Sequence, residues 1–249
     1  MSEPIGKGGA VLVVGASGGI GSAVLDHYLQ TPQYKRIFAV SRGERPDSLR
    51  SRGERLHWLV SDYSQSSVAS VAHALESSGE SLTRVIVCNG ILHNDRLAPE
   101  KSLLKLEAAA MQEVLHTNVV VPSLWIAALV RLLSGSPGCA VAVLSARVGS
   151  IKDNQLGGWY SYRASKAALN MVLKSAAVEY RRRLPRVKLL AFHPGTTDTA
   201  LSRPFQRGVA PDSLFTPAFV AQRLAQLLDQ LEPDGELSYL AWDGSSIEW

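Results

Sequence analysis

Two tyrosines and a lysine in the stretch "GGWYSYRASKAALN", residues 157–170, have the spacing of a proton-transfer site. Lys166 follows Tyr162 by four residues, about one helical turn, so their side chains would be neighbours on one helix face. Tyr160 has no such partner. A phenol has a pKa of about 10, and an adjacent ammonium group favours its ionised form. Ordinary amphipathic helices show the same spacing, so the rest of the chain must decide between the two interpretations.

Short apolar runs alternate with helical patterns, as expected for a parallel sheet covered on both faces. The sequence predicts strands at Ala10–Gly15, Arg36–Ser41, Leu56–Ser61, Arg84–Asn89, Cys139–Ser145, Val187–His193 and Leu237–Trp242. Helical periodicity covers Ile20–Gln30, Leu106–Leu133, Tyr160–Arg183 and Pro217–Leu231, and we expect Pro122 to kink the second of these helices. The expected fold class is α/β: a single domain over residues 1–249, with a doubly wound (Rossmann) parallel sheet of about seven strands and helices on both faces.

The composition argues against several classes of protein. Of the 249 residues, 46% are hydrophobic and 19% are charged, which suits a folded domain with a substantial core. The net charge of +4 is modest, and the basic run "RRRLPRVK", residues 181–188, is expected to end a helix rather than to bind nucleic acid. We recognise no signal peptide or membrane span, so the protein is expected to be cytoplasmic, with no nucleic-acid or membrane partner. Cys88 and Cys139 are expected to be reduced core residues, and no metal site is expected.

A cluster of glycines lies directly after the first predicted strand, in "VLVVGASGGIGSAVL". Gly15, Gly19 and Gly21 have the spacing G-x-x-x-G-x-G, and Gly18 is an additional glycine. Glycines allow a sharp turn and a close approach to a pyrophosphate, while the N-terminus of the following helix supplies N–H donors. A strand–turn–helix of this kind predicts a dinucleotide site, although a plain tight turn would also use glycine.

The second predicted strand ends in "FAVSRG". Sites that prefer NAD commonly hold the ribose 2′-hydroxyl with an acidic residue near this point, whereas arginine suits a 2′-phosphate. Here Ser41 and Arg42 occupy that place, and Glu44 lies two residues further on. The sequence therefore favours NADP(H) as cofactor and leaves NAD(H) possible; the alternative for Arg42 is a solvated loop charge.

These motifs, in this order, resemble those of the short-chain dehydrogenase/reductase family over almost the whole chain. The matching segments are "GASGGIG", "SDY", "CNG", "HTNVVVP", "YRASK" and "HPGTTDT". The resemblance implies these cofactor-binding residues: Gly15, Ser17, Gly18, Gly19, Ile20, Gly21, Ser41, Arg42, Asp62, Asn89, Gly90, Tyr162, Lys166, Pro194, Gly195, Thr197 and Thr199. More narrowly, "SARVGSIKDNQLGGWYSYRASKAALN" and the ending "YLAWDGSSIEW" look like the branch with C-factor-type proteins and Sniffer-type carbonyl reductases.

The resemblance also implies catalytic roles for Tyr162, Lys166, Asn118 and Ser145. Tyr162 would give a proton to the carbonyl oxygen while the cofactor gives hydride to the carbon, Lys166 would tune Tyr162 and hold the nicotinamide ribose, and Asn118 would support a water and lysine relay. The family usually ends its fifth strand with two serines, of which the second polarises the carbonyl. Here "VLSARVGS" has Ala146 in that second place, so we expect Ser145 to serve, with Ser150 as a poorer candidate and a site without any serine donor as the alternative.

We therefore expect an NADP-dependent carbonyl reductase or alcohol dehydrogenase that acts on a small molecule. The alternative is a nucleotide-binding regulatory protein with little catalysis, like C-factor-type relatives. Residues 200–217 are expected to form a substrate lid stiffened by three prolines, or else an ordinary surface connection. Trp159 and residues 92–94 are candidate pocket walls. The segment "VVVPSLWIAALVRLL" is apolar around much of its helix, and members of the family usually associate through their two long helices. We therefore expect a homodimer or homotetramer, with a monomer as the alternative.

Overall fold

The computed structural model describes residues 5–6, 8–52 and 54–249. One sheet of seven parallel strands has the order β3-β2-β1-β4-β5-β6-β9. Its strands are β1 (Ala10–Val14), β2 (Arg36–Ser41), β3 (Leu56–Val60), β4 (Leu82–Val87), β5 (Cys139–Leu144), β6 (Val187–His193) and β9 (Leu237–Ala241). The central strands β1, β4 and β5 are buried at every residue, which explains the unbroken apolar sequences of β1 and β5; β4 also buries Thr83 and Arg84. The predicted doubly wound sheet is confirmed.

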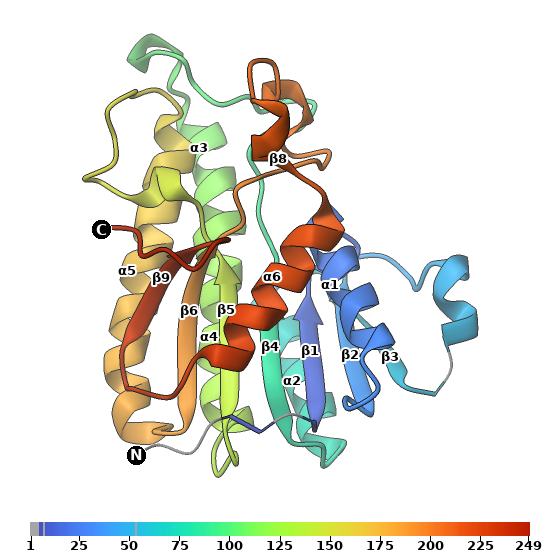
Figure 1. Ribbon diagram of the computed structural model, residues 1–249. Helices are drawn as coiled ribbons and strands as arrows, with labels where there is room; N and C mark the ends of the chain where they lie inside the picture. The colour runs from blue at the N-terminus through green and yellow to red at the C-terminus, as the bar shows by residue number, and fades with distance from the viewer. Residues whose placement is uncertain (1–4, 7, 53) are drawn as a thin grey trace.

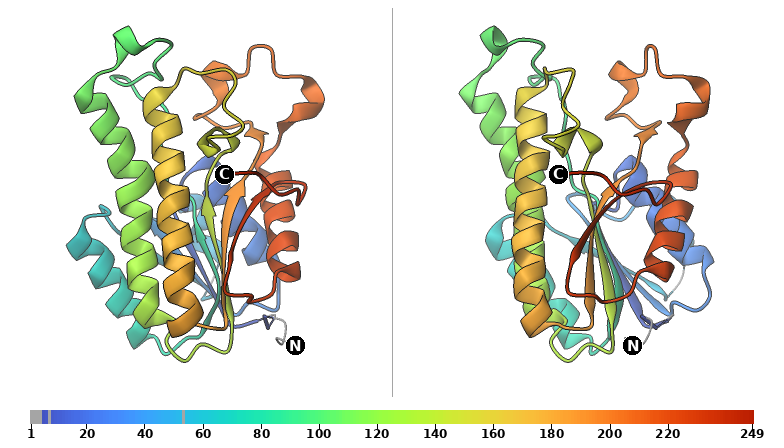
Figure 2. Two further views of the ribbon diagram at one scale, coloured as in Figure 1. Left: turned by 90° about the vertical axis from the view of Figure 1, so that its left-hand side faces the viewer. Right: turned by 60° about the vertical axis from the view of Figure 1, so that its left-hand side comes forward.

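Helices cover both faces of the sheet (Figures 1 and 2). They are α1 (Gly19–Gln30), α2 (Gln65–Ser77), α3 (Ala108–Leu115), α4 (Val121–Leu132), α5 (Tyr160–Arg183) and α6 (Pro217–Gln230). Helices α1 and α6 pack on one face, and α2, α4 and α5 pack on the other, so each face has its own hydrophobic core. A short pair of strands, β7 (Thr196–Thr197) and β8 (Leu214–Phe215), stands beyond the carboxyl end of β6. Helix α2 and the β7–β8 pair were not among the predicted elements.

The long helical region before β5 differs from the prediction. Instead of a kink at Pro122, a π-helical turn at His116–Val120 joins α3 to α4, and Pro122 lies in the first turn of α4. Proline is tolerated in the first turn of a helix because the N–H groups of that turn have no acceptor within the helix, so a missing N–H costs little there. The combined run Ala108–Leu132 is long and apolar enough to cross a membrane by length and composition, but core helices pass the same test. Trp125 and Leu129 of this run are fully buried against the sheet.

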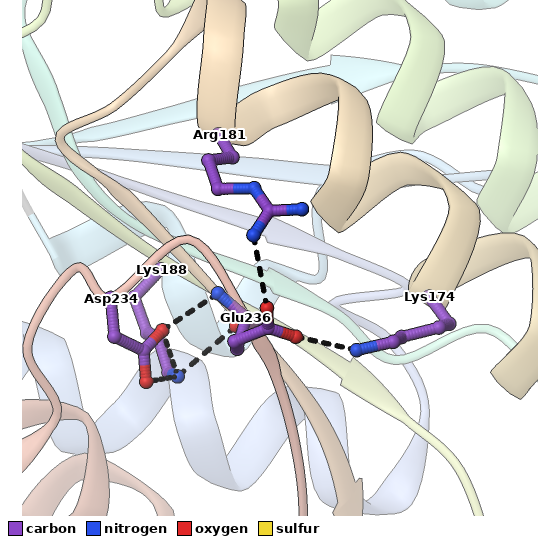
Figure 3. Close-up of polar contacts among 5 residues, drawn as sticks. All are labelled: Lys174, Arg181, Lys188, Asp234 and Glu236. Atoms are coloured by element: carbon purple, nitrogen blue, oxygen red, sulfur yellow. Dashed lines mark hydrogen bonds and ion pairs between the residues drawn. The ribbon is translucent and has the colours of Figure 1, made fainter.

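An ion-pair cluster fastens the edge strand β9 to its neighbours (Figure 3). The ammonium group of Lys188, on β6, donates to both carboxylate oxygens of Asp234 at 2.6 Å and to the Glu236 carbonyl oxygen at 3.1 Å. The Glu236 carboxylate accepts hydrogen bonds from Lys174 and Arg181 on α5. The side chain of Lys188 is only 1% exposed, so its charge depends on these partners.

This cluster also explains part of the basic run at residues 181–188. Helix α5 ends at Arg183, so its last turn carries three arginines, as the helix-end interpretation predicts. Arg183 pairs with Glu179 one turn earlier, and Arg181 and Lys188 pair with acidic groups before β9. These cations therefore hold together the end of α5 and the adjoining sheet edge.

Candidate active site

The turn between β1 and α1 requires glycine at two positions for different reasons. Gly15 has a φ of +80°, and a Cβ there would lie 3.2 Å from the Cys88 carbonyl carbon. A Cβ at Gly21 would lie 2.1 Å from the Gly15 carbonyl oxygen, so only glycine lets α1 start this close to the strand. The open N-terminal turn of α1 therefore lies at the carboxyl edge of the sheet, where backbone N–H groups can bind an anion.

Three adjoining hollows form one cleft along this edge of the sheet. The first contains Arg42 and Asp62, the second contains Lys166, and the third is lined by Trp159 and Phe205. Neighbouring hollows share lining residues, including Asn89 and Gly90 between the first two and Ser145 and Tyr162 between the last two. All of the predicted site residues line this cleft except Ser41 and Asn118. The cleft lies at the topological switch point between β1 and β4, where doubly wound sheets bind nucleotides.

The end of β2 is built from hydroxyl groups and an arginine. Ser41 is fully buried and donates a 2.7 Å hydrogen bond to Ser17, so it acts behind the cleft wall rather than in it. Arg42 is exposed and lines the same hollow as Ser17 and Asp62. Asp62 also accepts a hydrogen bond from the Ser64 backbone N–H at 2.8 Å, which orders the turn before α2. This end of the cleft fits a phosphate-bearing ribose, because an arginine can bind phosphate through paired N–H groups.

The middle of the cleft also fits a polar ligand. The side-chain oxygen of Asn89 is buried and has no hydrogen-bond partner among the described residues. Buried polar groups normally have partners, so an unpaired oxygen on the wall of a cleft indicates a place for a donor. Together with the glycine turn and Arg42, Asn89 gives this cleft the donor and acceptor groups that a dinucleotide cofactor needs.

Tyr162, Lys166 and Asn170 lie at four-residue intervals on one face of α5 and meet the end of β5. The Lys166 ammonium group is buried, 5.8 Å from the centre of the Tyr162 ring, and donates a 2.8 Å hydrogen bond to the Leu144 carbonyl oxygen. Ser145, the next residue, donates a 2.7 Å hydrogen bond to the side-chain oxygen of Asn170. Tyr162 and Ser145 both line the second and the third hollow, so they lie where these two hollows meet.

Burial has the largest effect on the pKa values of Tyr162 and Lys166. It raises the pKa of Tyr162 to about 12, with a smaller contribution from Tyr239, and it lowers the pKa of Lys166 to about 8. Lys166 is not among the groups that shift the pKa of Tyr162 here, so the lowering expected from Lys166 together with the oxidised nicotinamide stays a prediction. Desolvation disfavours the phenolate and the ammonium group alike, so any lowering requires a further positive charge in the cleft.

Tyr160 and Ser150, the alternatives to Tyr162 and Ser145, lie outside the cleft. Tyr160 is the first residue of α5 and does not line any of the three hollows. Ser150 is buried, and its hydroxyl oxygen accepts a hydrogen bond from the Asp153 backbone N–H at 3.1 Å. Of the two serines considered, Ser145 is the one placed beside Tyr162.

Asn118 lies behind the cleft wall, in the π-helical turn. Its side chain accepts a 2.7 Å hydrogen bond from the Ile91 N–H and donates to the Ile91 carbonyl oxygen and to Ser165. It therefore joins the segment after β4 to α5, and these side-chain hydrogen bonds go to Ile91 and Ser165 rather than to Lys166. Pro122 has no N–H, so the Asn118 carbonyl oxygen four residues earlier lacks its ordinary helical donor. A water relay through Asn118 stays a prediction.

Aromatic and aliphatic side chains form the far end of the cleft, a cavity of about 220 Å³. The ring of Trp159 contacts those of Tyr162 and Phe205, with centroids 6.2 and 5.1 Å apart, and Phe205 also contacts His93 at 5.5 Å. Trp159 has a left-handed backbone, with a φ of +53°. Such a conformation is unusual for a bulky residue and is often found at functional sites.

Two of the expected pocket walls, His93 and Asn94, do not line the cavity. Leu92 and Trp159 line the cavity, but the side chain of Asn94 donates instead to Glu113 at 2.7 Å. Sequence analysis also missed His193, which lines the cavity just before the predicted Pro194. Burial lowers the pKa of His193 to about 4, so its ring is neutral at neutral pH. Its position directly before the Pro-Gly pair was the only signal that could have identified it.

Comparison with known proteins identifies the family. A sequence model of the family described as "short chain dehydrogenase" matches residues 9–209, most of the chain. This chain belongs to the short-chain dehydrogenase family. It is accordingly an NAD(P)-dependent oxidoreductase, as the motifs implied.

Two relatives and two solved structures from the short-chain dehydrogenase family are similar to this chain. The 1-hydroxy-2-glutathionyl-2-methyl-3-butene dehydrogenase of Rhodococcus sp. (strain AD45) is 30% identical over 244 residues, covering 96% of this chain and 99% of the relative. The C-signal protein of Myxococcus xanthus is 33% identical over 109 residues, 44% of this chain and 60% of the relative.

Among solved structures, NADPH-bound carbonyl reductase from chicken fatty liver has a TM-score of 0.85 at 25% identity and covers 100% of this chain and 96% of its own. Carbonyl reductase Sniffer of D. melanogaster has a TM-score of 0.84 at 22% identity and covers 96% of this chain and 99% of its own. The predicted resemblance to the branch with C-factor-type and Sniffer-type proteins is confirmed.

Proposed function

We propose that this short-chain dehydrogenase is an NADP-dependent carbonyl reductase. The observation that carries the proposal is the position of Tyr162 and Ser145 at the junction of two hollows, one leading to the glycine turn and the other to an apolar cavity. A cofactor and a substrate in these hollows would meet beside the two hydroxyl groups. The likeness to an NADPH-bound carbonyl reductase supports the same activity.

We assign each of these residues a role on the basis of its position in the cleft. NADPH, held by the glycine turn and Arg42, would supply the hydride for the carbonyl carbon. The Tyr162 hydroxyl, protonated at neutral pH, donates its proton to the carbonyl oxygen. Lys166 favours the ionised form of Tyr162 that proton transfer leaves, and it can bind the nicotinamide ribose. Ser145 stabilises the carbonyl oxygen of the substrate as negative charge develops on it. The glycine turn binds the pyrophosphate, and Arg42 binds the 2′-phosphate.

The cavity favours substrates with an apolar ring next to the carbonyl group. Its walls include Leu92, Val148, Trp159, Leu201 and Phe205, and the lid segment 200–217 supplies the last two. Consumption of NADPH with a panel of carbonyl compounds tests the proposal. We expect kcat/KM to be at least about 10-fold higher for benzaldehyde or acetophenone than for acetaldehyde or acetone, because ring burial adds apolar contact area. A preference for the small aliphatic compounds would contradict this substrate class.

A nucleotide-binding regulator remains the second candidate. Ala146 in the place of the second serine and the similarity to C-signal favour it. The same panel separates the two: NADPH binding, seen as a change in its fluorescence, without turnover of any carbonyl would support the regulator.

The cofactor preference should depend on Arg42. We expect Arg42→Ala to reduce the ratio of kcat/KM with NADPH to that with NADH by about 10- to 100-fold, because a charge-assisted contact to the 2′-phosphate is lost. Arg45→Ala is the matched control, since Arg45 donates to the Leu49 carbonyl oxygen in its own loop, at 3.1 Å. Unchanged selectivity in Arg42→Ala would move the discriminating contact elsewhere.

We also propose a homodimer or homotetramer formed through the helix layer of α4 and α5 (Figure 2). Met171 and Val178, seven residues apart on α5, are 66% and 43% exposed, and Val120 is 44% exposed. A symmetric pairing would bury this apolar surface and brace the helix that bears Tyr162. Light scattering at micromolar concentration tests it: a particle near 26.9 kDa would be a monomer and would contradict the proposal.

A cytoplasmic location is proposed from the two cysteines. Cys88 and Cys139 are free thiols, and burial raises the pKa of each to about 12. Cys139 is a core group, whereas Cys88 is half-buried at the cleft wall, which corrects the expectation for Cys88; neither forms a disulfide among the described residues.

A further inference from the structure

Asn170 has a buried, unsatisfied group next to the proposed oxyanion donor. Its side-chain nitrogen Nδ2 is buried and has no hydrogen-bond partner within the described part of the chain, while its oxygen Oδ1 accepts from Ser145 at 2.7 Å. In this arrangement the only hydroxyl hydrogen of Ser145 is used by Asn170. Ser145 would then have no hydrogen to donate to a substrate.

The surrounding groups keep both residues in place. Ser145 and Asn170 are 3% and 4% exposed, and a Cβ at Gly149 would lie 3.1 Å from Nδ2 of Asn170. The Tyr239 hydroxyl donates to the Ala146 carbonyl oxygen at 2.6 Å. Burial raises the pKa of Tyr239, and the neighbouring Asn170 and Ser145 side chains offset part of that rise, so the three side chains form one polar cluster.

We propose that Asn170 is the positioning residue for the Ser145 hydroxyl. A half-turn of the Asn170 amide exchanges its oxygen and nitrogen, so that Nδ2 donates to Ser145 Oγ and the Ser145 hydrogen is free to bind the substrate oxygen. This proposal rests on the proposed carbonyl reductase activity. It also explains how a chain with Ala146 in the place of the second serine can still present a hydroxyl donor.

A double-mutant cycle tests the coupling between the two residues. We expect Ser145→Ala to lower kcat by about 100-fold, as for loss of one oxyanion donor. Asn170→Asp places two acceptor oxygens beside Ser145, which hold its hydrogen, so we expect kcat to fall at least about 10-fold with the dissociation constant for NADPH unchanged. The double variant should be within about 2-fold of Ser145→Ala, because the hydroxyl that Asn170 orients is already absent.

A second measurement does not depend on turnover. The chain has five asparagines, so selective ¹⁵N-asparagine labelling gives few side-chain amide signals, and that of Asn170 is identified by its loss in Asn170→Asp. If Nδ2 donates to Ser145, its ¹H and ¹⁵N shifts in the NADPH-bound protein should change in Ser145→Ala. Ser150→Ala, which removes a buried hydroxyl outside the cleft, is the control and should leave them unchanged.

Each outcome decides a separate point. A further drop of 10-fold or more on adding Asn170→Asp to Ser145→Ala would mean that the carboxylate acts on Tyr162 or Lys166 instead, and would overturn the proposal. An Asn170 amide signal insensitive to Ser145→Ala would also overturn it. If the wild-type protein reduces no carbonyl at all, the proposed function is wrong, and the amide signal still decides whether Asn170 donates to Ser145.

Discussion

Tyr162→Phe is expected to lower kcat for carbonyl reduction by about 100- to 10,000-fold, the range for loss of a general acid. The substitution removes one hydroxyl group at the junction of the two hollows and keeps the ring that contacts Trp159. NADPH should therefore bind with a dissociation constant within about 3-fold of the wild-type value. Steady-state kinetics and NADPH fluorescence measure the two quantities.

Tyr160→Phe provides the matched control on the same helix. Tyr160 is two residues away and does not line the cleft, so we expect its kcat to stay within about 2-fold of the wild-type value. Equal losses from the two substitutions would show that the wrong tyrosine has been identified. Because burial raises the pKa of Tyr162 to about 12, its proton remains in place at neutral pH, which suits the direction of carbonyl reduction.

Lys166→Met is expected to abolish turnover and yet make the protein more stable at pH 7. Burial lowers the pKa of Lys166 from 10.5 to about 8, which corresponds to a cost of about 3 kcal/mol for holding the ammonium group in the folded protein. Methionine avoids that cost. However, the Leu144 carbonyl oxygen then loses the hydrogen bond that Lys166 donates at 2.8 Å, which destabilises the variant by about 1–2 kcal/mol. The net gain of about 1–2 kcal/mol should raise the Tm by about 2–8 °C.

The pH dependence of this gain follows from the direction of the shift. Between about pH 8 and 10.5 the folded protein loses the Lys166 proton before the unfolded chain does, so wild-type stability rises relative to Lys166→Met. The advantage of the variant is complete below about pH 8 and is reversed by about pH 10.5, where only the loss of the hydrogen bond to the Leu144 carbonyl oxygen remains. Thermal melts at pH 7 and pH 10 measure it.

Lys174→Met is the control for this prediction. Lys174 lies on the same helix, but its side chain is 44% exposed and pairs with Glu236, so its replacement should bring no stability gain that depends on pH in this way. A Tm for Lys166→Met below that of the wild type at pH 7 would mean that the ammonium group stabilises the folded protein.

Sequence patterns determined the architecture and most of the site, because both depend on local periodicity. Alternation of apolar runs and helical stretches predicted the seven-stranded sheet, and the predicted bounds of the helix at Tyr160–Arg183 agree with the structure. The four-residue interval placed Tyr162 beside Lys166, and the same interval continued once more would have identified Asn170. The glycine turn was recognisable because only glycine tolerates the backbone contacts at Gly21.

Only the tertiary structure decided the features that depend on groups distant in sequence. The π-helical turn at His116–Val120 brings Asn118 to Ile91, and no local pattern encodes that contact. The pKa values of Tyr162 and Lys166 are likewise determined mainly by burial, which depends on how several elements pack around them. Packing of the chain determines which groups lose water, and desolvation at this site is larger than the effect of any single neighbour along the helix.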